Sequence, residues 1–260
     1  MKVVLIASSS GGSAKTTVAV RLAEELTRLK VRCGIVDLSP YPTASYLSNG
    51  GVQVVQGRGA TTTVAARCVL KPYEDLWDVA IVDTGRMDDP ILDYYSPLVD
   101  AVILTTRPDP YSLRSLQTVG QPLQRLKAGN PNQSFMGFLP VMTSFEGGYS
   151  IMPLRQAAGK YMINHPIPAS SWEWKKAHQS IFQEEGVVSQ PLDSVLDHDP
   201  VQAAVQGLAV AVLEHISVAI PEAKSEAAPT PTKEVGALTK LWRMATKNLG
   251  PKATVEGAAQ

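Results

Sequence analysis

Short runs of hydrophobic residues alternate with longer amphipathic stretches along the first 220 residues of the chain. The runs are rich in valine and isoleucine and alternate little with polar residues. This pattern is typical of strands that are buried on both faces of a parallel sheet. We predict five such strands, at Val3–Ala7, Cys33–Val36, Val79–Val82, Ala101–Leu104 and Phe135–Val141.

The stretches between these runs favour helices. In Thr16–Lys30, apolar residues recur at helical spacing and charged residues occupy the opposite face. Further helices are predicted at Ser112–Lys127, Ile151–Ile163 and Pro200–Val218. The alternation of strand and helix predicts an α/β fold, a doubly wound and mostly parallel sheet flanked by helices. Ligands bind such a sheet at the carboxyl ends of its strands.

The composition changes after residue 220. Residues 221–233 are rich in proline, alanine and charge, which predicts a flexible linker. Residues 234–260 form a tail in which 234–249 favours a short, basic, amphipathic helix with Trp242 on its apolar stripe. Such a helix can lie on an anionic membrane, dock onto a partner or fold back onto its own domain. We therefore predict a domain at 1–220, a linker at 221–233 and a tail at 234–260.

Composition and charge narrow the class of protein. With 260 residues, 44% of them hydrophobic, the chain can bury a sizeable core. The 24 basic and 24 acidic residues give a net charge of zero, which excludes a globally basic nucleic-acid coat but allows a local patch. Cys33 and Cys68 lie far apart, and the four histidines have no metal-binding spacing. Met1–Ala7 is too short to span a membrane, so we expect a soluble, cytoplasmic protein.

The first predicted strand leads into a Gly-rich turn that ends in Lys-Thr at the start of a helix. Backbone N–H groups and the helix N-terminus would face an anion there. Lys15 would reach the phosphates, and the Thr16 hydroxyl would complete a magnesium shell. The strict pattern G-x-x-x-x-G-K-[ST] has Ser9 and Ala14 at its glycine positions, so we expect ordinary φ angles at both. The alternative is a turn that caps the helix and leaves Lys15 in solvent.

Two aspartates follow neighbouring hydrophobic runs. Asp37 ends the second predicted strand and Asp83 ends the third. An acid in the position of Asp83 can hold magnesium through a water molecule. Either residue could instead cap the helix that follows it. A loop and two acids at three strand ends together indicate a site for a nucleotide phosphate with magnesium.

In this combination the chain resembles the ParA/MinD family of deviant-Walker ATPases, whose loop reads K-G-G-x-G-K-T-[ST]. The resemblance covers about residues 1–218 and includes Val36–Pro40 for the D-x-D-P segment, Val82–Gly85 for D-T-P and Asp100–Pro108 for a later strand. It implies that ATP and Mg²⁺ bind, with Lys15 and Asp37 catalytic, Thr16 and Asp83 holding the metal, and Ile167 and Pro168 near adenine. The residues implied to bind the phosphates are Ser10, Gly11, Gly12, Ser13, Ala14, Lys15, Thr16 and Thr17.

The chain departs from the family pattern at two positions. Ser10 replaces the signature lysine, which in the family reaches across an ATP-sandwiched dimer. This replacement is similar to the McdA branch, which positions carboxysomes, and it requires another cation, for which Arg86, Arg155 and Lys160 are candidates. Ser39 replaces the second acid of D-x-D-P and cannot carry its charge. We therefore expect slow or partner-stimulated hydrolysis, or dimerisation without turnover.

The resemblance implies an ATP-dependent positioning or partition ATPase. It would form a homodimer on Mg-ATP, bind nucleoid DNA non-specifically and respond to a ParB- or McdB-like adaptor that carries a carboxysome or plasmid. A basic patch would hold DNA phosphates, unless it is simply a solvated helix face. Its residues are Arg155, Lys160, Lys175 and Lys176. The alternative functions are a MinD-type membrane-associated switch or scaffold that uses the tail, and a kinase-like or cluster-carrying enzyme. Trp172 and Trp174 could stack on the base or simply pack.

Overall fold

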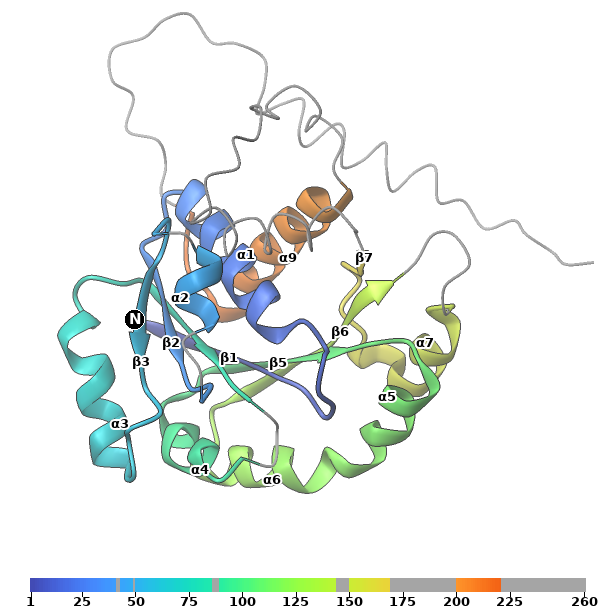
Figure 1. The fold of residues 1–260 in the computed structure, drawn as a ribbon, viewed down its shortest axis with the longest axis horizontal. Coiled ribbons are helices and arrows are strands. Elements are labelled where there is room, and N and C mark those ends of the chain that lie inside the picture. Colours follow the sequence, from blue (N-terminus) through green and yellow to red (C-terminus); the bar gives the residue numbers. More distant parts are fainter. Residues whose placement is uncertain (41–42, 49, 86–88, 144–149, 169–199, 221–260) are drawn as a thin grey trace, which may run out of the picture. The chain divides into compact units, whose positions relative to one another are not determined.

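The computed structural model describes residues 1–40, 43–48, 50–85, 89–143, 150–168 and 200–220. These residues form a seven-stranded parallel sheet in the order β3-β2-β4-β1-β5-β6-β7 (Figure 1). The predicted parallel α/β sheet is therefore confirmed. The strands are β1 (Lys2–Ala7), β2 (Cys33–Asp37), β3 (Gln53–Gln56), β4 (Val79–Asp83), β5 (Ala101–Thr106), β6 (Ser134–Thr143) and β7 (Ile167–Pro168).

Helices cover both faces of the sheet (Figure 1). One face carries α1 (Lys15–Arg28), α2 (Thr43–Ser48) and α9 (Pro200–Ile216). The other carries α3 (Thr63–Leu70), α4 (Ile91–Tyr95) and α6 (Gly120–Gly129). Two short helices, α5 (Pro110–Ser115) and α7 (Met152–Ala158), pack against each other. Four 3-10 turns complete the described elements, at Lys71–Tyr73, Ser96–Leu98, Leu116–Thr118 and Gly159–Tyr161.

The hydrophobic core has two halves, one on each face of the sheet. Along β1, Val4 and Ile6 pack with α1 and α9, whereas Val3 and Leu5 pack with the helices of the opposite face. Side chains on successive residues of a strand point to opposite faces, so a strand covered on both sides must be apolar throughout. This double burial explains why the central runs show no polar alternation.

The buried Glu25 carboxylate of α1 is paired with Arg28 on the same helix and is hydrogen-bonded to α9. Glu25 is 3% exposed, and its carboxylate accepts hydrogen bonds from Arg28 at 2.6 and 2.9 Å and from Gln202 on α9 at 2.9 Å. The Glu25 carboxylate raises the pKa of Arg28 through this hydrogen bond. A buried charge is tolerated only when it is paired in this way. The polar side of α1 is thus partly built into the domain.

Two of the predicted helices are shorter than expected. The helix at Ser112–Lys127 is divided into α5, a 3-10 turn and α6. Gly120 and Pro122 account for this break, because proline is accommodated in the first turn of a helix but not in its interior. The helix at Ile151–Ile163 ends at Ala158, where Gly159 leaves helical geometry at φ 53° and ψ −127°. The helices at Thr16–Lys30 and Pro200–Val218 are confirmed within two residues at each end.

The sequence pattern missed several short elements. Strand β3 has the pattern Q-V-V-Q, and β7 is only two residues long, so neither makes a hydrophobic run. Both nevertheless extend the sheet, since β3 pairs with β2 and β7 pairs with β6. Helices α2, α3 and α4 have five to eight residues, too few for a clear helical period.

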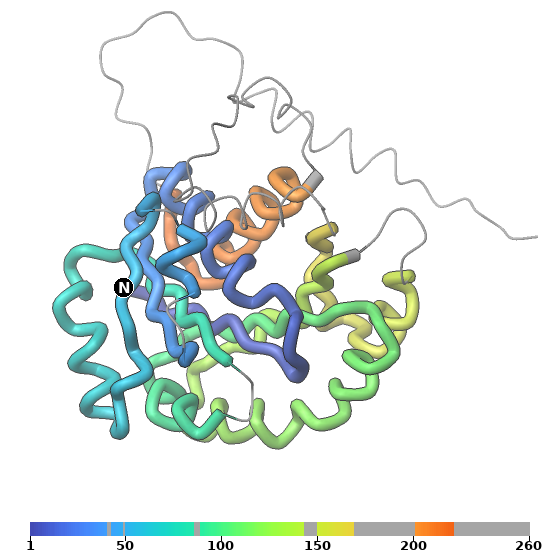
Figure 2. The backbone as a smooth tube through the Cα atoms, viewed as in Figure 1, coloured from blue at the N-terminus to red at the C-terminus, as the bar shows by residue number. Residues whose placement is uncertain are grey.

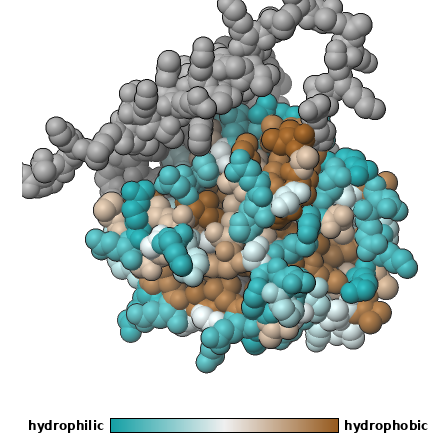
Figure 3. Space-filling model, turned by 180° about the vertical axis from the view of Figure 1, so that it is seen from behind, coloured by the Kyte–Doolittle hydropathy of each residue, from teal (hydrophilic) through white to brown (hydrophobic). Residues whose placement is uncertain are grey.

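The linker and tail predicted at 221–233 and 234–260 lie outside the described residues and remain predictions. Within the described ranges, no helix is both long enough and apolar enough to cross a membrane. The face of the molecule shown in Figure 3 intersperses hydrophilic and hydrophobic residues. Large hydrophobic side chains that are more than a third exposed include Val64 on α3, Tyr111 on α5, Met152 on α7 and Val210 on α9.

Candidate functional site

The turn between β1 and α1 forms a loop at the carboxyl end of the central strand (Figure 2). Two buried serines stabilise it from within, because the hydroxyl groups of Ser8 and Ser13 donate to the Ser10 carbonyl at 2.7 and 3.1 Å. Gly11 and Gly12 are exposed at its tip. Helix α1 begins directly after the loop with no side-chain cap and no acidic residue in its first turn. Its first N–H groups and its positive end are therefore available to an anion.

Ala14 departs from the expected backbone geometry. Its φ and ψ are 53° and 26°, in the left-handed region that favours glycine, so the expectation of an ordinary φ was wrong at this position. Ser9 is not among the described residues with positive φ, so the expectation was correct there. The loop keeps the conformation that the glycine of the strict pattern would adopt, and the Cβ of Ala14 makes this conformation strained.

Replacing Ala14 with glycine is expected to stabilise the domain. A left-handed conformation costs a non-glycine residue about 1–2 kcal/mol, and glycine loses about 0.4–1 kcal/mol more entropy on folding. The net gain in the free energy of unfolding should lie between about 0 and about 1.6 kcal/mol, measurable by urea denaturation. Ala128→Gly is the matched control, because exposed Ala128 lies in regular helix α6, where glycine should cost about 0.5–1 kcal/mol. Destabilisation by both variants would contradict strain at Ala14.

Lys15 points back into the loop. Its ammonium group donates to the Ser8 hydroxyl at 2.9 Å, and the side chain is half-buried. The alternative in which Lys15 extends into solvent is therefore not what the structure shows. Thr16 and Thr17 follow in the first turn of α1, both half-buried. The loop thus brings a cation and hydroxyl groups to the end of β1.

Asp83 ends β4, the strand that lies beside β1. Its side chain is fully buried, and neither carboxylate oxygen has a hydrogen-bond partner in the described part of the chain. The pKa of Asp83 is raised to about 7, mainly because burial disfavours the charged carboxylate. The Thr16 side chain and the charge of Lys15 act to lower this pKa, whereas the charge of Asp37 acts to raise it. A buried carboxylate without a partner is costly in free energy. This orphaned acid beside Thr16 suits a hydrated cation such as Mg²⁺, which prefers oxygen ligands.

Asp37 has a different environment, although it lies opposite Asp83 in the pairing of β2 with β4. One carboxylate oxygen accepts hydrogen bonds from the backbone N–H of Ser39, at 2.8 Å, and from its hydroxyl group. The other accepts from Ala44 N–H at 3.2 Å and from the Gln56 side-chain amide at 3.5 Å. These four donors tie Asp37 to the start of α2 and to β3. In this arrangement Asp37 caps the start of α2, which is one of the two roles that the sequence left open for it.

Helix α5 provides loop contacts that the sequence reasoning missed. The Ser10 hydroxyl lies 3.2 Å from that of Ser112, and the Ser9 hydroxyl lies 2.6 Å from that of Ser115. Asp109 begins α5, since its carboxylate accepts from the Ser112 N–H at 2.9 Å. The Asp-Pro-x-Ser pattern, typical of a helix start, was the signal that could have located it. Ser10, at the position of the family's lysine, is thus buried and directed into the protein.

The remaining candidate residues are spread along the sheet. Ile167 is half-buried and Pro168 is buried in edge strand β7, three strands away from β1. Arg155 on α7 and Lys160 in the following turn are exposed, and the Lys160 ammonium lies 5.2 Å from the centre of the Tyr161 ring. Lys175, Lys176, Trp172, Trp174 and Arg86 lie outside the described residues. The structure therefore brings the loop, Asp37 and Asp83 together at the carboxyl ends of the central strands. Of the proposed basic patch it describes two of the four residues, Arg155 and Lys160.

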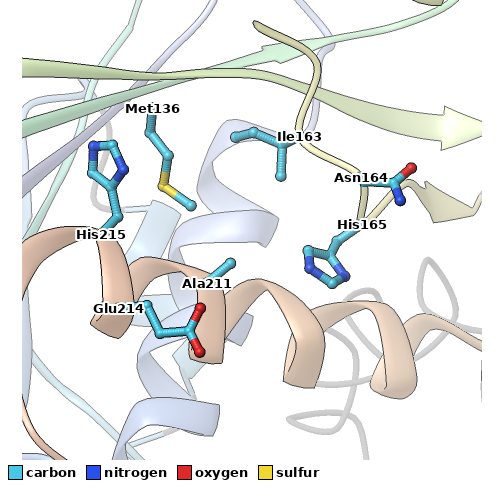
Figure 4. Close-up of a pocket in the computed structure, with 7 residues that line it drawn as sticks. All are labelled: Met136, Ile163, Asn164, His165, Ala211, Glu214 and His215. Atoms are coloured by element: carbon cyan, nitrogen blue, oxygen red, sulfur yellow. The ribbon is translucent and has the colours of Figure 1, made fainter. Parts of the chain in front are cut away.

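A separate hollow of about 440 Å³ lies between α9 and the segment that leads into β7 (Figure 4). Met136 and Ile163 line it together with His165, Glu214 and His215. The His165 ring packs against α9 at Gly207, where a Cβ would come within 2.4 Å of the ring. The His215 ring lies 2.7 Å from the Ser134 hydroxyl at the amino end of β6. This hollow is thus near the amino end of β6, away from the carboxyl ends at which the loop lies.

The strand order, the loop after β1 and the acid at the end of the adjacent strand define the fold of the ParA/MinD-type P-loop NTPases. Among solved structures, apo McdA of Cyanothece is similar to the chain with a TM-score of 0.64 and 18% identity, covering 82% of this chain and 99% of McdA. MinD of Aquifex aeolicus, solved in complex with MinC, has a TM-score of 0.63 and 12% identity, covering 89% and 99% of the two chains.

A third similar structure is the cobyrinic acid a,c-diamide synthase of Mycobacterium smegmatis, solved with a bound ATP analogue and magnesium. Its TM-score is 0.61 and its identity is 18%, with 83% of this chain and 95% of the synthase covered. No protein-family model and no curated protein matches the chain. The property shared with these three proteins is the fold, and a shared fold does not by itself show a shared function.

Proposed function

We propose that the chain is a ParA/MinD-type ATPase that binds Mg-ATP at the loop between β1 and α1. The observation that carries this proposal is the buried Asp83 carboxylate, which lacks a hydrogen-bond partner in the described structure beside the uncapped start of α1. An anion at the helix N-terminus and a cation at Asp83 would each satisfy groups that are otherwise costly. Solved structures with the same fold include McdA in complex with ATP and MinD with Mg-ADP, which supports the choice of ligand.

In the proposed complex, each part of the loop has a defined role. The N–H groups of Ser10–Thr17 would surround the phosphates, and the Lys15 ammonium, which donates to the Ser8 hydroxyl in the structure, would bind the β- and γ-phosphate oxygens. Thr16 would hold the metal directly, and Asp83 would hold it through a water molecule. Magnesium, when bound, neutralises charge on the phosphate oxygens. Ile167 and Pro168, in the edge strand β7, are proposed to lie near adenine.

Hydrolysis is proposed to be slow or to depend on a partner. Asp37 is the remaining acid that could align the attacking water, but both of its oxygens already accept hydrogen bonds within the protein. Ser39, in place of the family's second acid, donates to Asp37 and adds no negative charge. Faster hydrolysis would therefore require Asp37 to lose some of its hydrogen-bond donors, or an adaptor to supply the negative charge that Ser39 lacks.

The proposed biological role is ATP-dependent positioning of a cargo such as a carboxysome or a plasmid. The chain would dimerise on Mg-ATP, associate with nucleoid DNA through phosphate contacts and be released by a ParB- or McdB-like adaptor. Similarity in fold to McdA supports this role, and exposed Arg155 and Lys160 offer cationic contacts. DNA bound in this way would be held without sequence preference and would dissociate as salt is raised.

Gel filtration with light scattering tests the switch. A non-hydrolysable ATP analogue with Mg²⁺ should shift the mass from 27.9 kDa to twice that value, whereas ADP should not. DNA retention should appear only with the analogue and should weaken in an Arg155→Glu, Lys160→Glu double variant. A monomer under both nucleotide conditions would contradict the proposal.

The MinD-type membrane alternative rests on residues 234–260, which lie outside the described structure. Sedimentation with anionic vesicles, comparing the full chain with a chain that ends at residue 220, separates the two roles. Vesicle binding that is lost on truncation, without DNA retention, would favour the membrane role.

A further inference from the structure

Arg107 lies beside the phosphate loop, although it comes from a distant part of the sequence. It follows β5, the strand that pairs with β1 on the side opposite β4. Its Nη1 is 3.6 Å from the position that a Cβ on Gly12 would occupy, so the guanidinium is in contact with the loop tip. The side chain is 39% exposed and can meet a ligand without a change in the fold.

Asp109 holds this guanidinium in place. The Asp109 carboxylate pairs with the Arg107 Nε at 2.9 Å and accepts from the Ser112 hydroxyl at 3.0 Å. Burial acts to raise the pKa of Asp109, but hydrogen bonds from Ser112 and the charge of Arg107 outweigh it, so the pKa lies below its usual value. Ser112 in turn contacts Ser10 in the loop. Arg107 is therefore connected to the loop on two sides, through Gly12 and through Asp109 and Ser112.

The negative charges at the carboxyl ends of the central strands exceed what Lys15 alone can balance when a nucleotide is bound. Two buried acids, Asp83 and the residue opposite it, Asp37, lie at the strand ends before any ligand is bound, and the charge of Lys15 acts on Asp83. A nucleotide triphosphate with one magnesium ion adds roughly two further negative charges. A guanidinium presents N–H donors in a planar fork that matches phosphate oxygens. The Nε end of Arg107 is held by Asp109 while its Nη1 end faces Gly12, the orientation that such a contact needs.

We propose that Arg107 is a second phosphate-binding cation, which contacts the nucleotide in the loop of its own chain. This inference rests on the proposed function, since it concerns the same ligand. It assigns the contact in cis because the guanidinium already touches Gly12 of its own loop. Gly12 contributes by the lack of a side chain between the guanidinium and the loop backbone.

Calorimetry of the full chain with Mg²⁺ and a non-hydrolysable ATP analogue tests the proposal. Arg107→Gln should bind about tenfold more weakly, the loss expected for a charge-assisted contact. Arg107→Lys, which keeps the charge but not the planar fork, should lose less. Arg32→Gln is the matched control, because Arg32 is also exposed and paired with an aspartate, Asp78, but lies at the amino ends of the strands. It should bind as the wild type does.

Each outcome bears on the inference. Unfolding midpoints without nucleotide should agree between wild type and Arg107→Gln. If the midpoints differ, Arg107→Lys replaces Arg107→Gln in the comparison. An unchanged affinity of Arg107→Lys for the nucleotide would then overturn the proposal. Wild-type binding with an unchanged Arg107→Gln affinity would overturn the inference and leave the proposed function standing. A loss seen only at protein concentrations where the chain dimerises would overturn the assignment in cis. No uptake by the wild type would overturn both.

Discussion

Lys15→Ala is expected to weaken binding of Mg-ATP by about 100-fold. The ammonium group would lose charge-assisted hydrogen bonds to two phosphates, worth about 1.5–3 kcal/mol, in a site that already contains two buried acids. Calorimetry of the purified variant in magnesium buffer measures the loss directly. Apo stability should change little, since the buried Ser8 hydroxyl keeps its hydrogen bond to the Ser10 carbonyl when the ammonium group of half-buried Lys15 is removed.

Lys2→Ala is the control for Lys15→Ala. Lys2 begins the same strand, β1, and forms an ion pair with Asp100 at 3.0 Å at the opposite end of the sheet. An exposed pair of this kind contributes at most about 1 kcal/mol to stability. Its loss should leave nucleotide affinity unchanged. Equal affinity in wild type and Lys15→Ala would remove the basis of the phosphate site.

Asp83→Asn is expected to raise the stability of the nucleotide-free protein at pH 8 by as much as about 4 kcal/mol. The folded pKa of about 7 lies above the unfolded value of 3.8, so the folded state binds the proton more tightly. Wild-type stability should therefore fall as the pH rises from about 4 to about 7 and then level off. Asparagine carries no charge to bury, so the gain should be larger at pH 8 than at pH 5.

Urea denaturation without Mg²⁺ or nucleotide at both pH values measures this difference. The same variant should bind the nucleotide more weakly in magnesium buffer, because the proposed water-mediated metal contact is lost. Asp93→Asn, on α4 with a side chain that is 50% exposed, controls for removal of one acid and should change stability little at either pH. A gain in Asp83→Asn that is equal at pH 5 and pH 8 would contradict the raised pKa.

Both variants should weaken nucleotide binding, but only Asp83→Asn should raise the stability of the nucleotide-free protein. Lys15 should matter for the ligand and little for the fold, whereas Asp83 should lower the stability of the empty protein and support the loaded one. Functional sites commonly retain such unfavourable groups, whose cost is offset when the ligand arrives. Ala14, held at a φ of 53°, is a second example in the same loop.

The sequence by itself determined the parallel sheet, the loop and the strand-end positions of both aspartates. These features depend on local signals: strands buried on both faces need continuous apolar runs, and a glycine-rich turn before Lys-Thr is typical of a phosphate loop. The central strands β1, β2, β4 and β5 all lie within two residues of their predicted bounds. Features that depend only on the local sequence pattern can therefore be predicted from the sequence.

Only the tertiary structure decided which distant groups meet. That Arg107 lies at Gly12, that Ser10 faces Ser112, and that Asp37 is filled by donors while Asp83 is left without one in the described chain all depend on strand order and helix placement. Strands β3 and β7 formed against neighbouring strands rather than from a strong pattern of their own. Local propensity is weak in such short segments, and packing against the rest of the fold supplies the free energy that holds them.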